Sequence, residues 1–135
     1  KNDTPGTYSG KFSTPVLWDK KKSCIVNTES AEIMVMLNSQ FQEWAKYPEI
    51  DLYPSDLADL CKTAHEWILP HICSGVYKTG FAKEQEAYDI AVNRLFENLD
   101  RAEALLSKQR YVAGDKLTYL DVRLFMTLVR LDEAY

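Results

Sequence analysis

The sequence lacks long apolar runs, an excess of basic residues and glycine-rich loops, and each absence excludes a class of function. No apolar run approaches the roughly 18 residues that a membrane-spanning helix requires. With 16 basic against 20 acidic side chains, the chain has no basic stripe that would neutralise nucleic-acid phosphates. No glycine pattern forms a phosphate-binding loop. We therefore expect no membrane and no nucleic acid among the partners.

Cysteine is also scarce. Three residues, without the spacing of a disulfide scaffold, indicate a reducing compartment, and we expect a cytoplasmic protein. Two cysteines and two histidines occur close together, at Cys61, His65, His71 and Cys73. Their spacing matches no common zinc motif, and Pro70 interrupts the helix that carries them. Because free cysteines on an apolar helix face are usually small core residues, we expect no metal site.

Two short apolar runs near the N-terminus predict a β-hairpin. Residues 12–19 read as a strand in which Pro15 indicates an edge position or a cis peptide bond. Residues 24–27 read as a second strand, and the lysine-rich segment 19–23 reads as the turn between them. A helix follows, with Thr28 as its expected N-cap.

Helical periodicity dominates the chain after residues 45–56, a segment with two prolines that reads as a linker. One long helix is predicted over 57–72, with a kink at Pro70. A second is predicted over 83–107. Its buried stripe is expected to contain Tyr88, Val92, Leu95, Phe96, Leu99, Ala102 and Leu106.

The stretch RYVAGDKLTYLD predicts a sharply defined helix start. Thr118 can cap the amide of Asp121 while the Asp121 side chain reaches back, which is a capping box. The helix predicted over 119–135 has no stop signal, and two strands alone cannot form a stable domain in water. We therefore expect an α+β, mostly helical piece of a larger protein.

The segment where the second strand meets the first helix has two open interpretations. Free amides at the helix start and the Ser30 hydroxyl suit a carboxylate, and Glu29 can pair with an ammonium group, so the set could hold the head of an α-amino acid. The alternative is that Thr28 and Glu29 only cap the helix. Tyr77 likewise either offers its hydroxyl to a ligand or packs at a helix end.

Several motifs together resemble the glutathione transferases: TPVL in the first strand, Glu29-Ser30 at a helix start, and GDKLTYLD in an all-helical half. Three longer stretches are similar to the Xi class of that family, the glutathionyl-hydroquinone reductases. These are PVLWDKK…IVNTESAEIMVMLN, GVYKTGFAKEQEAYDIAV and RYVAGDKLTYLDVRLFMTLVRLDEAY. The resemblance covers most of residues 10–135.

The resemblance implies a two-domain organisation. Residues 1–44 would be the C-terminal half of a thioredoxin-like domain, residues 45–56 a linker, and residues 57–135 a truncated all-α C-terminal domain of a glutathione transferase. The nucleophile of this family lies in a Cys-Pro-x-Ala motif on an earlier helix, and the chain contains no Cys-Pro dipeptide. We therefore expect no catalytic residue in this chain, and no activity from this piece alone.

The resemblance also implies the residues that contact ligands. Glutathione would be held by Lys11, Thr14, Pro15, Glu29 and Ser30, and Tyr77 would line the hydroquinone pocket. Thr14, before a cis-proline, would pair with the cysteinyl backbone, while Glu29 and Ser30 would hold the γ-glutamyl head. Lys11 stands where the family pattern has arginine, which keeps the charge but loses bidentate carboxylate pairing.

The activity that the resemblance implies is glutathione-dependent reduction of glutathionyl-hydroquinones. Glutathione would be the co-substrate, quinone-derived small molecules would be the substrates, and no metal would be required. The resemblance also implies a homodimer. Two alternatives remain open. One is a transferase-like interaction module without catalysis, and the other is a conventional transferase that conjugates glutathione.

Overall fold

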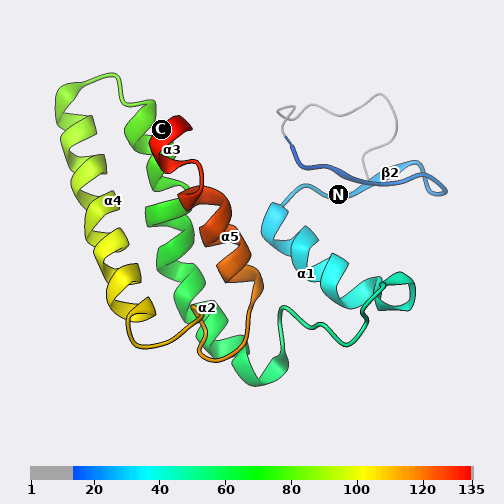
Figure 1. Ribbon diagram of the computed structural model, residues 1–135. Helices are drawn as coiled ribbons and strands as arrows, with labels where there is room; N and C mark the ends of the chain where they lie inside the picture. The colour runs from blue at the N-terminus through cyan, green and yellow to red at the C-terminus, as the bar shows by residue number, and fades with distance from the viewer. Residues whose placement is uncertain (1–13, 135) are drawn as a thin grey trace. The chain divides into compact units, whose positions relative to one another are not determined.

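The computed structural model describes residues 14–134 of the 135-residue chain, and these form two compact units that meet in sequence between Asp51 and Leu52 (Figure 1). The first unit contains a hairpin and one α-helix, and the second contains only helices, turns and one isolated bridge. The described residues are therefore mostly helical with a two-stranded sheet, as the sequence predicts.

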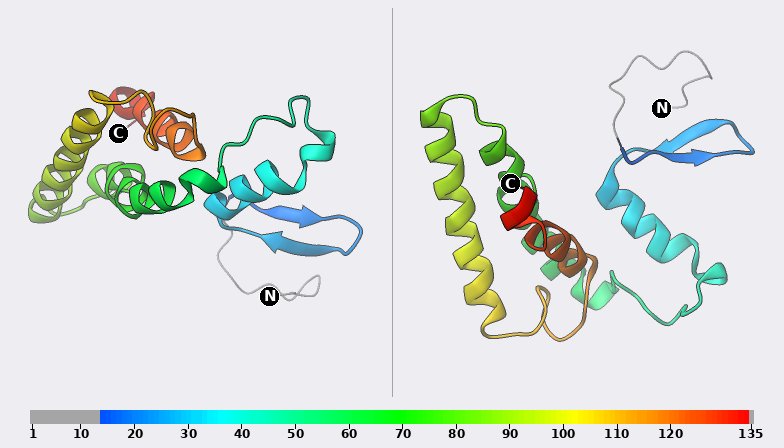
Figure 2. Two further views of the ribbon diagram at one scale, coloured as in Figure 1. Left: turned by 90° about the horizontal axis from the view of Figure 1, so that it is seen from below. Right: turned by 45° about the horizontal axis from the view of Figure 1, so that its top comes forward.

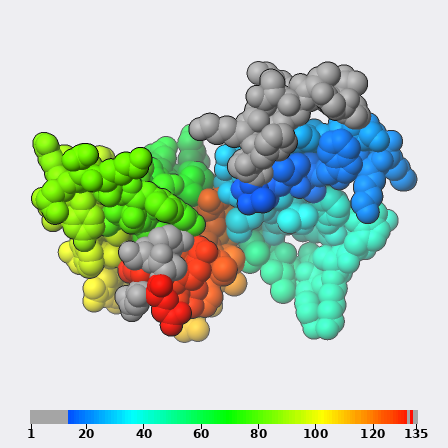
Figure 3. Space-filling view, turned by 90° about the horizontal axis from the view of Figure 1, so that it is seen from above, coloured from blue at the N-terminus to red at the C-terminus, as the bar shows by residue number. Residues whose placement is uncertain are grey.

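The hairpin of the first unit joins β1 (Leu17–Asp19) to β2 (Cys24–Asn27) in antiparallel register, with Leu17 opposite Asn27. Asp19 organises the turn, because its Oδ1 accepts hydrogen bonds from the amides of Lys21 (2.8 Å) and Lys22 (2.9 Å). Lys20, Lys21 and Lys22 are exposed, so the lysine-rich turn is solvated, as predicted, and part of the hairpin is visible at the surface in Figure 3.

The first unit departs from the sequence prediction at two places. The first strand begins at Leu17 within the described residues, and the part of the prediction that falls on residues 12 and 13 lies outside them. The helix α1 (Ser30–Gln40) has Glu29 rather than Thr28 as its N-cap residue, so the prediction for Thr28 is wrong. A short 3₁₀ turn, η1 (Gln42–Trp44), follows α1.

The second unit is built around a helical hairpin (Figures 1 and 2). One arm runs through η2 (Ser55–Leu57), α2 (Ala58–Trp67), η3 (Ile68–Cys73) and α3 (Gly75–Gly80), and the other arm is α4 (Gln85–Leu106). A loop then leads to α5 (Tyr119–Leu128) and α6 (Leu131–Ala134). The helix predicted as continuous over 119–135 is thus interrupted after Leu128.

The kink predicted at Pro70 takes the form of a π-helical segment. Residues Ile68–Cys73 widen the helix, and the amide of Ser74 donates to the carbonyl of Leu69 (2.9 Å). Proline has no amide hydrogen to donate within a helix, and its ring clashes with the preceding turn, so the backbone adopts a wider turn there. Ile68 and Ile72 on this segment are fully buried.

The core of the second unit lies where η3 and α3 pack against α4 and α5. Its most buried side chains are Cys61, Ile68, Ile72, Val76, Thr118 and Leu120. The stripe predicted for α4 is only partly correct, because Leu95 and Ala102 are buried whereas Tyr88, Phe96 and Leu106 are exposed. Leu95 and Ala102 are seven residues apart and so share one side of the helix, while Phe96 is turned away from it and is 56% exposed.

The predicted capping box at Thr118 and Asp121 is present at the start of α5. Asp121 Oδ2 accepts hydrogen bonds from the Thr118 amide and hydroxyl, each at 2.8 Å, and its Oδ1 accepts one from the Val112 amide (2.7 Å). One carboxylate therefore both caps the helix and ties the preceding loop to it.

Within the described residues, no helix is long and apolar enough to cross a membrane.

Candidate functional site

The start of α1 is organised by Asn27. Its Oδ1 accepts a hydrogen bond from the Glu29 amide (2.8 Å), and its Nδ2 donates to the Glu32 carboxylate (2.6 Å). The N-cap residue Glu29 makes no side-chain capping hydrogen bond, and its side chain is exposed. Asn27 therefore fixes the chain where it enters α1. The Glu29 carboxylate is not used for capping and remains available to a ligand.

The backbone at this position favours an anion. Amides in the first turn of a helix, here those of Ser30, Ala31 and Glu32, have no acceptor within the helix. They point out of the positive end of the helix dipole. Ser30 is half-buried and adds a hydroxyl donor. The amides and the Ser30 hydroxyl could donate hydrogen bonds to a carboxylate of a ligand, and the Glu29 carboxylate could pair with its ammonium group.

Thr14 and Pro15 lie at the same end of the hairpin as Glu29 and Ser30. The antiparallel register pairs Leu17 with Asn27, so the chain just before Leu17 runs alongside the chain just after Asn27. The peptide bond between Thr14 and Pro15 is cis, and both residues are exposed. Four of the five predicted glutathione contacts thus belong to one end of one unit. The fifth, Lys11, lies outside the described residues.

Tyr77 belongs to the helical unit, on α3. Its side chain is 44% exposed, and its ring stacks on that of Phe81 with the centroids 6.3 Å apart and the planes 13° from parallel. This placement near the end of α3 agrees with both interpretations, a ring packed at a helix end and a hydroxyl offered to a ligand, so the role of Tyr77 stays a prediction. The stacked pair presents an aromatic surface of the kind that ligand sites use.

The cysteines of the chain have the environment of structural residues. Cys61 is fully buried, and this burial raises the pKa of its thiol, which keeps it protonated and weakly nucleophilic at neutral pH. The thiol of Cys73 donates to the carbonyl of Arg123 at 3.9 Å, and Cys24 is half-buried in β2. Within residues 14–134, no group of three or more histidine, cysteine or acidic side chains is placed to hold a metal.

Sequence reasoning missed two features of the chain. It did not identify the turn in which Asn27 accepts a hydrogen bond from the Glu29 amide, although an asparagine two residues before the N-cap residue is a recognisable signal for such a bond. It also missed a pocket between the two arms of the helical hairpin, which His71, Lys78 and Arg94 help to line. No local pattern reveals that pocket, because its cations come from segments that only the folded hairpin brings together.

Comparison with known proteins connects these features to one family. The family model for the C-terminal domain of glutathione S-transferases matches residues 85–135. Glutathionyl-hydroquinone reductase YqjG of Escherichia coli is 47% identical over 128 residues, which are 95% of this chain and 39% of YqjG. Glutathionyl-hydroquinone reductase PcpF of Sphingobium chlorophenolicum is 41% identical over 129 residues, which are 96% of this chain and 41% of PcpF.

Solved structures give the same grouping. Glutathione transferase Xi 1 of Trametes versicolor matches with a TM-score of 0.86 and 48% identity, over 93% of this chain and 44% of that one. The glutathione-bound structure of YqjG matches with a TM-score of 0.87 and 47% identity, over 95% of this chain and 41% of that one. The chain spans about two fifths of the length of the curated relatives that it matches.

Proposed function

Because the chain belongs to the Xi class of the glutathione transferase family, we propose that it is the part of a glutathionyl-hydroquinone reductase that holds glutathione and forms one wall of the hydroquinone pocket. The observation that carries the proposal is the 47% identity to YqjG across 95% of the chain. The geometry at the start of α1 supports it, because the Glu29 carboxylate is not used for capping.

Each contact follows from the chemistry of glutathione. The γ-glutamyl carboxylate binds the Ser30 hydroxyl and the first amides of α1, and its ammonium group pairs with Glu29. The backbone of Thr14, before Pro15, pairs with the cysteinyl backbone, and Lys11 attracts the glycyl carboxylate. Tyr77 offers its phenolic hydroxyl to the hydroquinone.

In the proposed reaction, a cysteine thiolate outside these residues attacks the sulfur of a glutathionyl-hydroquinone. The carbon–sulfur bond breaks, the ring carbon takes up a proton, and hydroquinone leaves while a cysteine–glutathione disulfide forms. A second glutathione thiolate then attacks this mixed disulfide, which releases oxidised glutathione and restores the cysteine thiolate. The role of this chain is binding and orientation, so by itself it is inactive.

The domain organisation remains a proposal with the predicted boundaries. Residues 1–44 form part of a thioredoxin-like domain, residues 45–56 a linker, and residues 57–135 part of the helical domain. The division between Asp51 and Leu52 lies inside the proposed linker, which supports this reading. The full-length protein is proposed to be a cytoplasmic homodimer; three free cysteines agree with a reducing compartment.

The experiment that tests the function is product analysis of the full-length protein. With a glutathionyl-hydroquinone and glutathione as substrates, we expect free hydroquinone and oxidised glutathione in equal amounts. Conjugation of glutathione to an electrophilic aromatic substrate, without this reduction, would instead identify a conventional transferase. Glutathione binding with neither reaction would favour an interaction module.

A further inference from the structure

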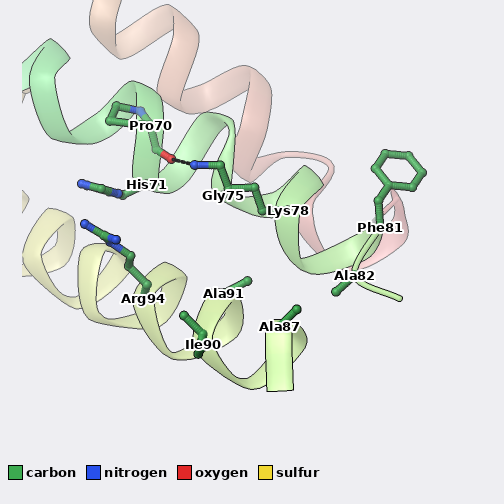
Figure 4. Close-up of a pocket in the computed structure, with 10 residues that line it drawn as sticks. All are labelled: Pro70, His71, Gly75, Lys78, Phe81, Ala82, Ala87, Ile90, Ala91 and Arg94. Carbon is green, nitrogen blue, oxygen red and sulfur yellow. Dashed lines mark hydrogen bonds between the residues drawn. The ribbon is translucent and has the colours of Figure 1, made fainter. Parts of the chain in front are cut away.

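A pocket opens between the two arms of the helical hairpin (Figure 4). Its volume is about 490 Å³, within the range of small-molecule sites in proteins. From α4, the side chains of Ala87, Ile90 and Ala91 form an apolar floor, and Pro70 and Phe81 contribute further apolar surface from the opposite arm. We call this cavity the basic pocket, because of the groups described next.

Every ionisable group that lines the basic pocket is a base. His71 comes from η3, Lys78 from α3 and Arg94 from α4, and no aspartate or glutamate is among the lining residues that the structure describes. Lys78 Nζ donates to the carbonyl of Pro70 at 3.4 Å, as Figure 4 shows. Over residues 14–134, no carboxylate forms an ion pair with Lys78 or Arg94. Their charges are therefore not neutralised within the described chain.

His71 lies close enough to the other bases of the pocket for their charges to act on it. Burial, followed by the charges of Arg94, Lys78 and Arg101, lowers the pKa of the imidazole. The ring is therefore neutral at pH 7 and can donate one hydrogen bond without adding to the charge. An anion placed among these groups would relieve their mutual repulsion.

The basic pocket shares Phe81 with the aromatic pair that contains Tyr77, but its lining is otherwise distinct from the proposed glutathione and hydroquinone contacts. None of the residues assigned to those ligands lines it, and Tyr77 is absent from its wall although the neighbouring Lys78 is present. The function proposed above therefore leaves the basic pocket without a role.

We propose that the basic pocket binds a small aromatic carboxylate. The planar guanidinium of Arg94 suits bidentate pairing with a carboxylate, and the Lys78 ammonium group adds a second charge-assisted contact. Ala87, Ala91 and Ile90 on α4 present an apolar surface against which an aromatic body can lie, and Phe81 adds an aromatic ring to the lining. The carboxylate of such a ligand would then contact the two cations, and its aromatic ring would contact the apolar lining.

The test is calorimetric titration of the full-length protein, saturated with glutathione, with 1-naphthoate and with its neutral isostere 1-naphthamide. We expect naphthoate to bind at least about tenfold more tightly, since charge-assisted hydrogen bonds are the stronger ones. Arg94→Gln and Lys78→Gln should each remove most of this preference. Lys62→Gln, which removes the same charge from an exposed position on α2, should leave it unchanged.

A second variant tests location rather than charge. Ala91→Phe fills the pocket from its floor and should abolish binding of both ligands, with thermal unfolding measured to establish that the variant is folded. The proposal is overturned if the wild type does not bind naphthoate or binds both ligands equally. It is also overturned if Lys62→Gln loses the preference as fully as Arg94→Gln, or if the folded Ala91→Phe and Arg94→Gln proteins both bind naphthoate as the wild type does.

Discussion

Tyr77 carries the one side-chain hydroxyl of the helical unit that the proposed reaction uses. In the full-length protein, Tyr77→Phe is expected to slow hydroquinone release by about tenfold, the worth of one hydrogen bond, because only the phenolic oxygen is lost while the ring stacked on Phe81 remains. Glutathione affinity should not change. The measurement is steady-state kinetics together with calorimetry, and Tyr88→Phe on α4 is the matched control. Equal loss of glutathione affinity and turnover would mean that Tyr77 is structural.

Cys61 gives a second prediction at a single position. Because it is fully buried and burial raises the pKa of its thiol, it should resist alkylation by iodoacetamide at pH 7 in the folded full-length protein. It should react only after unfolding in denaturant. Mass spectrometry of digested samples reports the labelled position, with the half-buried Cys24 as an internal comparison. Rapid labelling of Cys61 in the folded state would contradict the structural role.

The turn between α4 and α5 depends on one backbone conformation. Gly114 has φ +113°, where side chains are strained, and it exchanges backbone hydrogen bonds with Tyr111. Gly114→Ala is therefore expected to lower the free energy of unfolding by about 1–2 kcal/mol. Gly80→Ala at the end of α3 is the matched control, because its φ is ordinary and an added Cβ would meet no atom within 4 Å. Denaturant unfolding of the full-length variants measures both; an equal effect of the two substitutions would contradict the account.

The elements that follow from local chemistry were predictable from the sequence. The hairpin turn needs only Asp19 and the residues after it, and the capping box needs only Thr118 and Asp121, so short patterns reveal both. The π-helical segment was predicted only as a kink, because how a helix accommodates Pro70 depends on its packing against α4 and α5. The exposure of Phe96 was missed because periodicity identifies an apolar face but not its centre.

The candidate site was predictable in part. Glu29 and Ser30 stand out where a strand runs into a helix, but two interpretations remained because local sequence does not show which side chain caps the helix. In the structure neither Thr28 nor Glu29 makes a side-chain capping hydrogen bond, and Asn27 instead accepts one from the Glu29 amide. The basic pocket could not be predicted, since Lys78 and Arg94 become neighbours of one cavity only when the helical hairpin closes.

At the scale of the whole molecule, we propose that glutathione binding and bond breaking belong to different parts of the full-length protein. Within these 135 residues there is no Cys-Pro dipeptide, while the α1 start offers unused hydrogen-bonding groups for an amino-acid head. The full-length protein is therefore expected to combine this chain with a cysteine from another segment. Removing that cysteine should abolish reduction and leave glutathione binding, whereas changing Glu29 should weaken the binding itself.

The most direct measurement is calorimetric titration of glutathione into the full-length protein and its Glu29→Ala variant, with Glu43→Ala, an exposed acidic residue on η1, as the control. We expect Glu29→Ala to weaken binding by more than about tenfold, a loss of more than about 1.4 kcal/mol, because one charge-assisted contact to the ammonium group disappears. Glu43→Ala should bind as the wild type does. Unchanged affinity in the Glu29→Ala protein would contradict the proposal that this chain holds the γ-glutamyl group.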